Sequence, residues 1–175
     1  MSWFLWIGGC IAMIGGLAAT IGALLPVGHH ATRRARFRAA PEALYAVLAG
    51  PPDWRTGVKS FGVLPESDGR RRWWEEDSHR QKIAYELVEA SPGRRLQVRI
   101  AQPGLPFGGT WTFDIAAAGP EGPAGGSALR ISEDGEIYNV LFRFMARFVF
   151  GYYGSIDTYL RDLGAKFGQT VEIEA

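Results

Sequence analysis

The sequence predicts an α+β fold in which a curved antiparallel sheet holds one long C-terminal helix, preceded by a single transmembrane helix. Three observations predict it. The first 32 of the 175 residues contain no Lys, Arg, Asp or Glu, although the chain has 19 basic and 18 acidic residues. Residues 71–131 contain several runs in which apolar and polar residues alternate, as in strands with one buried face. From Asn139 to Phe167, apolar residues instead recur every three or four positions, as on one face of a helix.

The uncharged segment from Trp3 to Leu25 is 23 residues long and is followed by Pro26, which ends a helix. At about 1.5 Å per residue, such a helix is roughly 34 Å long, enough to cross a hydrocarbon core of about 30 Å. Trp3 and Trp6 then lie at one interface as membrane-contact residues. This segment is therefore expected to be a membrane anchor.

Three other interpretations of the segment are weighed against an anchor. A cleaved signal peptide usually has a basic start and a shorter apolar stretch, and this segment has neither. Ile7-Gly8-Gly9-Cys10 resembles a lipoprotein acylation site, but only nine residues precede the cysteine and none is basic. A buried helix in a soluble domain of this size is rarely apolar on every face. We therefore expect a transmembrane anchor over residues 1–26 and one folded domain over residues 27–175.

The flanks of this helix predict its orientation. Four arginines follow it closely, whereas the other side offers only the amino terminus; they are Arg33, Arg34, Arg36 and Arg38. Because positive charge favours the cytoplasmic side, we expect a single-pass protein of the cell inner membrane with a cytoplasmic domain. The same arginines also fit the exposed face of a first strand.

A stripe of small residues also follows the helix. It consists of Gly8, Ala12, Gly15, Ala19 and Gly22. Such a stripe lets two helices approach closely in lipid, which predicts helix–helix association. Glycine and alanine are also frequent in membrane helices for other reasons.

The folded domain is expected to begin with a strand over residues 31–39 and a short helix over 41–48, in which Pro41 suits the first turn. Asp53 is expected to cap a second short helix near Trp54. Alternation then predicts strands over residues 71–77, 83–87, 96–100, 111–115 and 129–131. Residues 119–126 (GPEGPAGG) are expected to form a flexible hairpin loop. The helix over 139–167 covers the apolar face of the sheet.

Several motifs resemble those of a known superfamily. They are Leu105-Pro-Phe-Gly-Gly-Thr-Trp111, Glu133-Asp-Gly-Glu-Ile-Tyr-Asn139, Phe142-Arg-Phe144 and Arg147-Phe148. From about residue 25 to 168, the chain resembles the START/Bet v 1-like (SRPBCC) superfamily, in its polyketide cyclase/dehydrase and lipid transport branch, and its membrane-anchored bacterial members. The resemblance implies a helix-grip fold with a hydrophobic cavity between sheet and helix. It does not imply one chemistry, because this fold hosts carriers, receptors and cyclases.

Aromatic side chains that are expected to face the interior are the candidates for binding a hydrophobic ligand in that cavity. They are Trp74, Tyr85, Trp111 and Phe113 from strands, with Phe144 and Phe148 from the helix. Each ring equally fits ordinary core packing. Enough large rings facing one another would leave no cavity.

Polar residues near these rings are the candidates for orienting the ligand. They are Glu76, Glu133, Glu136, Tyr138 and Asn139. Glu133 is also the candidate catalytic residue, because alternation from Leu129 and Ile131 points it inward. A carboxyl group facing an apolar cavity has a raised pKa and can act as a general acid or base. The alternative is a solvated turn around Gly135 in which these acids pair with arginines.

The segment Val140–Tyr153 has a second apolar face, which includes Phe142 and Phe150 and is interrupted only by Arg143 and Arg147. At 14 residues the segment is too short to cross a bilayer. It can lie at the membrane surface with both arginines near lipid phosphates, as membrane-contact residues. Equally, this face can pack on the short helices and the strand ends.

Several classes of site are excluded by the composition. A single cysteine, Cys10, excludes an internal disulfide and a Cys-based zinc site. His29, His30 and His79 have no further ligands at metal spacing, so neither a metal nor a cofactor is expected. A net charge of +1 argues against nucleic acid as a partner.

Three functions are consistent with these residues. The first is a membrane-anchored binding or carrier protein for a lipid, isoprenoid quinone or polyketide-like molecule, with membrane lipid and that ligand as partners. The second is a cyclase/dehydrase-like or hydrolytic enzyme that uses the Glu133 carboxylate. The third is an interaction module that docks on a membrane complex through the anchor and the face of Phe142 and Phe150.

Overall fold

The computed structural model describes residues 2–119 and 125–175. The elements follow in the order α1 (Ser2–Leu24), β1 (Gly28–Phe37), α2 (Pro41–Ala49), β2 (Ser60–Ser67), β3 (Arg70–Glu76), β4 (Lys82–Ser91), β5 (Arg95–Ile100), β6 (Phe107–Ala117), β7 (Ser127–Ile137), α3 (Val140–Met145), the π-helical turn η1 (Ala146–Phe150), α4 (Gly154–Lys166) and β8 (Ile173–Glu174).

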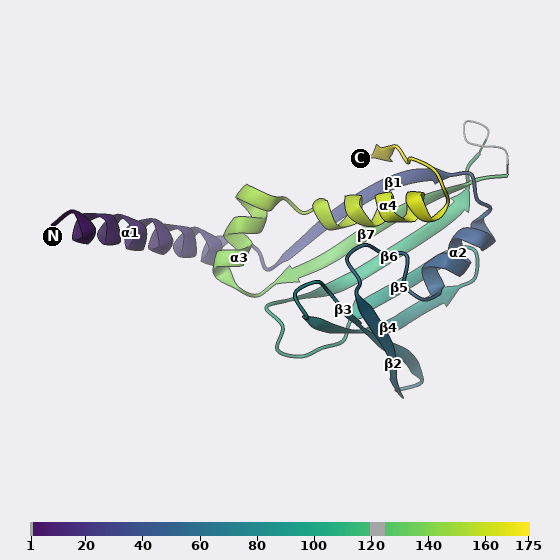
Figure 1. Cartoon of the computed structure of the whole chain (residues 1–175), viewed down its shortest axis with the longest axis horizontal. Coiled ribbons are helices and arrows are strands. Elements are labelled where there is room, and N and C mark those ends of the chain that lie inside the picture. Colours follow the sequence, from purple (N-terminus) through teal and green to yellow (C-terminus); the bar gives the residue numbers. More distant parts are fainter. Residues whose placement is uncertain (1, 120–124) are drawn as a thin grey trace.

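The strands form one antiparallel sheet of eight, in the order β2-β3-β4-β5-β6-β7-β1-β8. β1 pairs with β7 along its whole length, so the first strand lies between β7 and the short β8. The sheet curves around α4, while α1 projects away from the rest of the chain (Figure 1). This arrangement confirms the predicted α+β helix-grip architecture.

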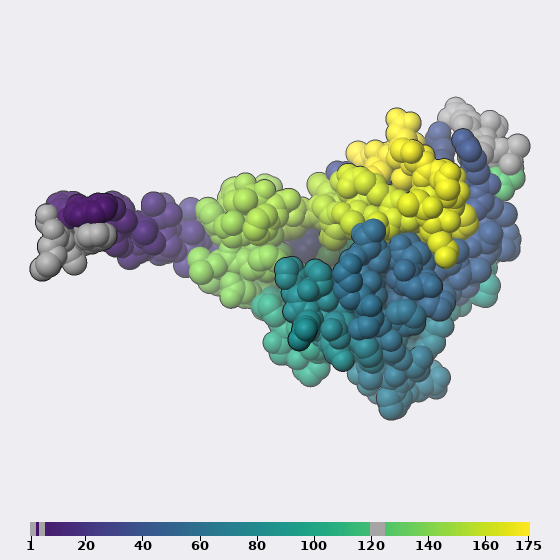
Figure 2. Space-filling model, viewed as in Figure 1, coloured from purple at the N-terminus to yellow at the C-terminus, as the bar shows by residue number. Residues whose placement is uncertain are grey.

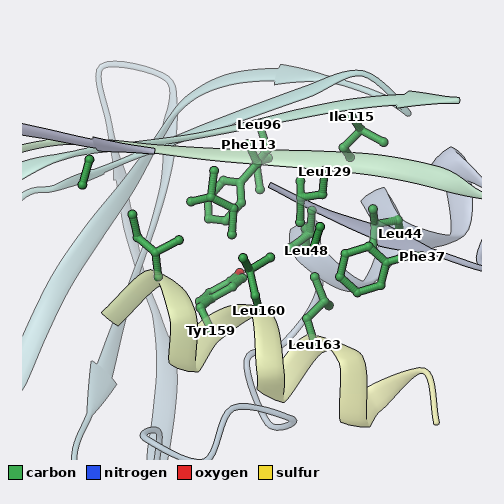
Figure 3. Packing of buried hydrophobic residues seen from close by; sticks show 14 residues of the cluster. Phe37, Leu44, Leu48, Leu96, Phe113, Ile115, Leu129, Tyr159, Leu160 and Leu163 are labelled. Atoms are coloured by element: carbon green, nitrogen blue, oxygen red, sulfur yellow. The ribbon is translucent and has the colours of Figure 1, made fainter. Parts of the chain in front are cut away.

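The core lies between the concave face of the sheet and α4 (Figure 3). Phe37 and Leu129 come from the sheet, and Leu160 and Leu163 come from α4; all four side chains are fully buried. Alternation along the strands and the helical spacing along α4 both direct these side chains inward. Leu44 of α2 closes the same end of the core.

The predicted continuous helix over residues 139–167 is wrong, because the chain divides into α3, η1 and α4. Gly151 has a φ of 73°, which glycine adopts without strain, and the chain leaves the helix there. The preceding π-helical turn contains extra backbone and so changes which side chains share a face. Phe148, expected to face the interior, is 58% exposed, and Leu141 of α3 is 47% exposed.

The segment between α2 and β3 also differs from the expected one. Residues 51–59 form turns instead of the helix expected near Trp54. They are held on α4, where Asp162 Oδ2 accepts a hydrogen bond from the Thr56 amide at 2.8 Å. β2 then follows, and it was not predicted because Gly62 and Pro65 interrupt its alternation. The predicted loop over residues 119–126 does join β6 to β7, but its residues 120–124 lie outside the described part.

α1 is an apolar helix whose side chains are almost all exposed. Within the described residues, Trp6–Leu24 is the one helix that is long and apolar enough to cross a membrane, with 19 residues that are nearly all exposed. Membrane anchors and signal sequences both have these properties. Trp3 and Trp6 are 58% and 76% exposed.

The C-terminal end of α1 packs on α3. A Cβ atom at Gly22 would lie 1.9 Å from the Val140 carbonyl oxygen, so only glycine fits at this contact. Arg143 Nη1 donates to the Leu25 carbonyl oxygen at 2.8 Å, and its Nη2 donates to the Tyr138 carbonyl at 3.3 Å. Arg143 therefore joins α3 to the end of α1, and contact of its guanidinium with lipid phosphates stays a prediction. Arg147 is exposed, as a membrane-contact residue would be.

At Gly22, α3 of the same chain therefore covers part of the predicted small-residue stripe. Gly8 and Gly15 have no atom within 4 Å of the position a Cβ would take. Association of two helices through the rest of the stripe stays a prediction.

Candidate functional site

A cavity of about 970 Å³ lies between the concave face of the sheet and the helices. Strands β3 to β7 form its floor, and α4 forms its roof. α3 and η1 close the end nearest α1, and residues 48–63 form the opposite wall. Figure 2 shows the surface hollowed between the yellow-green helical segment and the blue and teal residues in front of it. Sites for small molecules typically have volumes of roughly 300–1,000 Å³.

Four of the residues predicted to bind a ligand line this cavity, namely Tyr85, Trp111, Phe113 and Glu133. The Trp111 and Phe113 rings point inward from alternate positions of β6. Their centroids lie 5.6 and 5.3 Å from that of Tyr159, which reaches them from α4. These residues make the floor and roof of the cavity aromatic, and their contact with a ligand stays a prediction.

The interior positions expected for Trp74 and Glu76 are wrong. On β3, Trp73 and Glu75 face the cavity, whereas Trp74 and Glu76 lie on the outer face of the sheet. There, Lys82 Nζ is 4.2 Å from the centroid of the Trp74 ring and 3.5 Å from Glu76 Oε2. The error arises because arginine, tryptophan and glutamate occur in the same order on both faces of this strand.

The prediction that Phe144 and Phe148 of the helical segment face the cavity is also wrong. Phe142 and Phe150 line the cavity. Phe144 instead lies beside Gly22 of α1, and its ring centroid is 5.0 Å from that of the exposed Phe148. Both faces of α3 and η1 are apolar, so hydrophobic spacing does not distinguish them.

Two other predicted polar residues have local roles. Tyr138 is 50% exposed and donates a hydrogen bond to Glu136, which lies at the edge of the cavity. Asn139 caps α3, because its Oδ1 accepts a hydrogen bond from the Phe142 amide at 2.9 Å. Tyr138 is therefore outside the cavity, contrary to its expected place in the site.

A buried polar cluster on the β3 side of the cavity was not predicted. Arg55 Nη1 lies 2.6 Å from Glu75 Oε2, and the guanidinium carbon lies 4.9 Å from the centroid of Tyr159. Trp73 Nε1 donates to Glu75 Oε1 at 3.0 Å, and its ring stacks on Tyr85. Burial, with Glu75 nearby, raises the pKa of Tyr85 to about 12, and burial also raises the pKa of Tyr159. Both phenols therefore remain hydrogen-bond donors at neutral pH.

A second polar group lies on the β1–β7 side of the cavity. His29 Nε2 is 3.9 Å from Glu133 Oε1, and the two side chains are 13% and 17% exposed. The sequence does not indicate His29 as a cavity residue, because a histidine at the start of a strand carries no periodic signal. Burial, and then the charge of His30, lower the pKa of His29. Burial raises the pKa of Glu133, and a hydrogen bond with the Trp111 side chain opposes this in part.

Glu133→Gln is expected to remove a pH dependence of stability. Because the folded pKa of Glu133 lies above its ordinary 4.5, the folded protein keeps a proton that the unfolded chain has released. The wild-type free energy of unfolding therefore decreases as the pH rises from about 4.5 through the raised pKa, and the variant lacks this contribution. Urea unfolding across this range measures it, with Glu66→Gln at an exposed position as the control. Identical pH profiles for wild type and Glu133→Gln would contradict the shift.

The chemical groups of the cavity are thus hydrogen-bond donors and acceptors on apolar walls. Within residues 2–119 and 125–175, no three His, Cys, Asp or Glu side chains lie close enough together to hold a metal ion. The phenols, the indoles and the Glu133 carboxyl are the groups that can contact polar atoms of a ligand.

Comparison with known proteins places the chain among relatives of this architecture. Residues 28–166 match the sequence profile of the family described as polyketide cyclase / dehydrase and lipid transport. No curated protein matches the chain. Among similar solved structures, XoxI from Bacillus cereus is 16% identical with a TM-score of 0.61, covering 79% of this chain and 94% of its own.

Two further solved structures have the same fold. A conserved protein from Geobacillus kaustophilus is 12% identical with a TM-score of 0.61, covering 84% of this chain and 100% of its own. Norcoclaurine synthase from Thalictrum flavum is 9% identical with a TM-score of 0.58, covering 82% of this chain and 88% of its own. At these identities the likeness establishes the fold alone. The sequence match over residues 28–166 establishes more: this chain belongs to the polyketide cyclase/dehydrase and lipid transport family.

Proposed function

We propose that the protein binds a small hydrophobic molecule in this cavity, at a membrane to which residues 1–26 anchor the domain of residues 27–175. The observation that carries the proposal is the cavity of about 970 Å³, whose lining is mainly aromatic and aliphatic. Its charged side chains come mainly from the β3 side and the β1–β7 side, and most of the remaining lining is apolar, as is typical of sites for largely apolar ligands. Membership of a family that includes lipid transport supports the same function.

The rim of the cavity supports uptake from a bilayer. Four apolar residues line the cavity and are also exposed, namely Phe61 (43%), Val63 (85%), Phe142 (40%) and Phe150 (62%). The last two belong to α3 and η1, and α3 packs on the end of α1 (Figure 1). With α1 in the bilayer, Phe142 and Phe150 lie on the side of the rim nearest the membrane surface, so a ligand dissolved in lipid reaches this side by lateral diffusion.

Native mass spectrometry of the full chain, released from lipid nanodiscs, is expected to show a co-purifying hydrophobic compound. Val98→Phe adds a ring to the cavity floor and should reduce the bound fraction severalfold, because the added side chain occupies ligand volume. Val149→Phe makes the same change at an exposed position outside the cavity and should leave the bound fraction unchanged. Equal occupancy in the two variants, or empty spectra of the wild type, would contradict the proposal.

The single cysteine allows the anchor to be tested. Cys10 lies in the middle of α1, so it should resist a membrane-impermeant maleimide in intact vesicles and react after denaturation. In a Cys10→Ser background, the exposed Ser78→Cys should react in inside-out vesicles and not in intact cells, as a cytoplasmic domain requires. A mature chain that begins after α1 would instead identify a cleaved signal sequence.

A second candidate function is acid–base catalysis on the bound molecule by Glu133. The observation that favours it is that Glu133 Oε2 is buried in the cavity wall without a hydrogen-bond partner. A protonated carboxyl in such a position is available to transfer a proton to a ligand.

A further inference from the structure

Two polar atoms on the β1–β7 side of the cavity are buried and lack a hydrogen-bond partner. They are His29 Nδ1 and Glu133 Oε2. Both side chains line the cavity, and their closest polar atoms, Nε2 and Oε1, are 3.9 Å apart, which is beyond hydrogen-bond distance. Unsatisfied polar atoms are unfavourable in a protein interior. Both side chains line the cavity, so a ligand there is placed to form hydrogen bonds with their polar groups.

The surrounding residues hold both side chains in place. The His29 ring stacks on Tyr152, with centroids 4.2 Å apart and planes at 17°. The ring also lies over Gly135, where a Cβ atom would be 2.2 Å from it, so the paired strand leaves room for the imidazole. Trp111 is the cross-strand partner of Glu133 on β6 and lies on the same face of the sheet. A site built in this way offers its unpaired atoms at fixed positions.

The charges around the pair are already compensated or absent. Arg33 of β1 forms an ion pair with Asp157 at 3.1 Å, and its guanidinium lies over the ring of Tyr153. No ion pair among the described residues brings a lysine or arginine to Glu133. On the roof, α4 contributes the uncharged Ser155 and Thr158, and also Asp162, which accepts a hydrogen bond from the Thr56 amide.

The other charged residues that line the cavity come from the segment before β2, from β3, from β7 and from α4; they are Arg55, Arg71, Arg72, Glu75, Glu136 and Asp162. His30 accompanies His29 on β1 but is exposed and lies 2.8 Å from Asp134 on the outer side of the sheet. Glu136 of β7 is engaged by the hydroxyl of Tyr138. Burial favours the uncharged forms of both His29 and Glu133, in agreement with this setting.

We propose that His29 and Glu133 form a polar subsite that binds an uncharged oxygen function, a carbonyl or a hydroxyl group, of an otherwise apolar ligand. This inference rests on the proposed function and names the class of ligand. In its protonated form the Glu133 carboxyl donates to a carbonyl oxygen, and an imidazole nitrogen of His29 accepts from a hydroxyl group. An ionised head group is disfavoured beside this pair, because no lysine or arginine among the described residues forms an ion pair with Glu133; the arginines that line the cavity, Arg55, Arg71 and Arg72, come from the segment before β2 and from β3. Neutral ketones, quinones, phenols and alcohols fit this subsite.

Photolabelling of the full chain in phosphatidylcholine nanodiscs tests the subsite. The probe is 4-dodecylbenzophenone, a neutral ketone that labels nearby residues on illumination, and labelled cavity-lining peptides are counted by mass spectrometry. Competitors are compared at equal mole fraction in the lipid. For the wild type, 2-dodecanone should compete about tenfold better than dodecane, the effect of one buried hydrogen bond. Dodecanesulfonate should compete less well than 2-dodecanone.

Matched variants separate the two residues. Glu133→Leu should reduce the advantage of 2-dodecanone over dodecane to less than about twofold, whereas Glu133→Gln keeps a donor and should retain it. His29→Phe keeps a ring on Tyr152 and should reduce competition by 1-dodecanol without changing that by 2-dodecanone. If Glu133→Leu does not fold, Glu133→Gln and His29→Phe still decide the result.

The outcomes distinguish the subsite from the cavity. An unchanged preference for 2-dodecanone in Glu133→Leu, with cavity peptides still labelled, would overturn the subsite and leave the proposed function intact. Stronger competition by dodecanesulfonate than by 2-dodecanone would also overturn the subsite. Absence of labelling in the cavity of the wild type would overturn the proposed function and the subsite together.

Discussion

Replacing Glu75 with alanine is expected to lower the free energy of unfolding by about 3 kcal/mol. The Glu75 side chain is 10% exposed and lies 2.6 Å from Arg55, whose side chain is 26% exposed. It also accepts a hydrogen bond from Trp73 Nε1 at 3.0 Å. Its removal leaves a largely buried guanidinium without a counter-ion and an indole without an acceptor. Breaking one side of a buried ion pair typically costs 3–5 kcal/mol, and the partial exposure of Arg55 places this case at about the lower end.

Urea unfolding of the full chain in lipid nanodiscs measures the change, and Glu76→Ala is the matched control. Glu76 is the next residue of β3 and lies on the outer face of the sheet, 3.5 Å from the 58% exposed Lys82 side chain. An exposed pair of this kind contributes at most about 1 kcal/mol. Changing both partners, in Arg55→Met with Glu75→Leu, should recover part of the lost stability, because no charge remains unpaired. Equal effects of Glu75→Ala and Glu76→Ala would contradict the assignment of the two faces.

Leu160→Ala is expected to lower the free energy of unfolding by about 3 kcal/mol or more. Leu160 is fully buried in the middle of α4, where it packs in the cluster that contains Phe37 and Leu129 (Figure 3). The variant loses the transfer free energy of the removed carbon atoms, and the packed neighbours close the resulting space only in part. Leu160 is not a lining residue of the cavity, so the change affects the solid part of the core.

The control for this variant is Leu141→Ala in α3. The Leu141 side chain is 47% exposed, so its truncation removes little buried area and should change the stability by less than about 1 kcal/mol. Thermal unfolding followed by far-ultraviolet circular dichroism compares both variants with the wild type. A decrease no larger for Leu160→Ala than for Leu141→Ala would show that α4 is not held in the sheet as described.

Much of the fold follows from the sequence because its signals are local. Alternation correctly places Tyr85 on the inner face of β4 and Phe113 on the inner face of β6. The helical spacing of Ile156, Leu160 and Leu163 places the buried face of α4. In each case one face is apolar and the other is not, so the pattern identifies the buried side.

The remaining errors occur where both faces look alike or where the signal is not periodic. On β3, the set with Trp73 and the set with Trp74 have the same residue types, and only the long-range partner Arg55 identifies the inner one. On α3 and η1 both faces are apolar, and the π-helical turn before Gly151 changes their direction. Arg55 lies in a turn and His29 at a strand start, so tertiary contacts alone bring them to the cavity.

The short join between α1 and β1 has a consequence for how a bound molecule is passed on. Only Leu25, Pro26 and Val27 separate the two elements, and an extended chain of three residues reaches at most about 10 Å. Hydrogen bonds from Arg143 and from the Ile137 amide further fix the carbonyls of Leu25 and Val27. Under the proposed anchoring, the domain has no flexible linker that would let it reach a distant bilayer. The bound molecule is then exchanged within a single leaflet of the anchoring membrane, and the protein does not carry it between membranes.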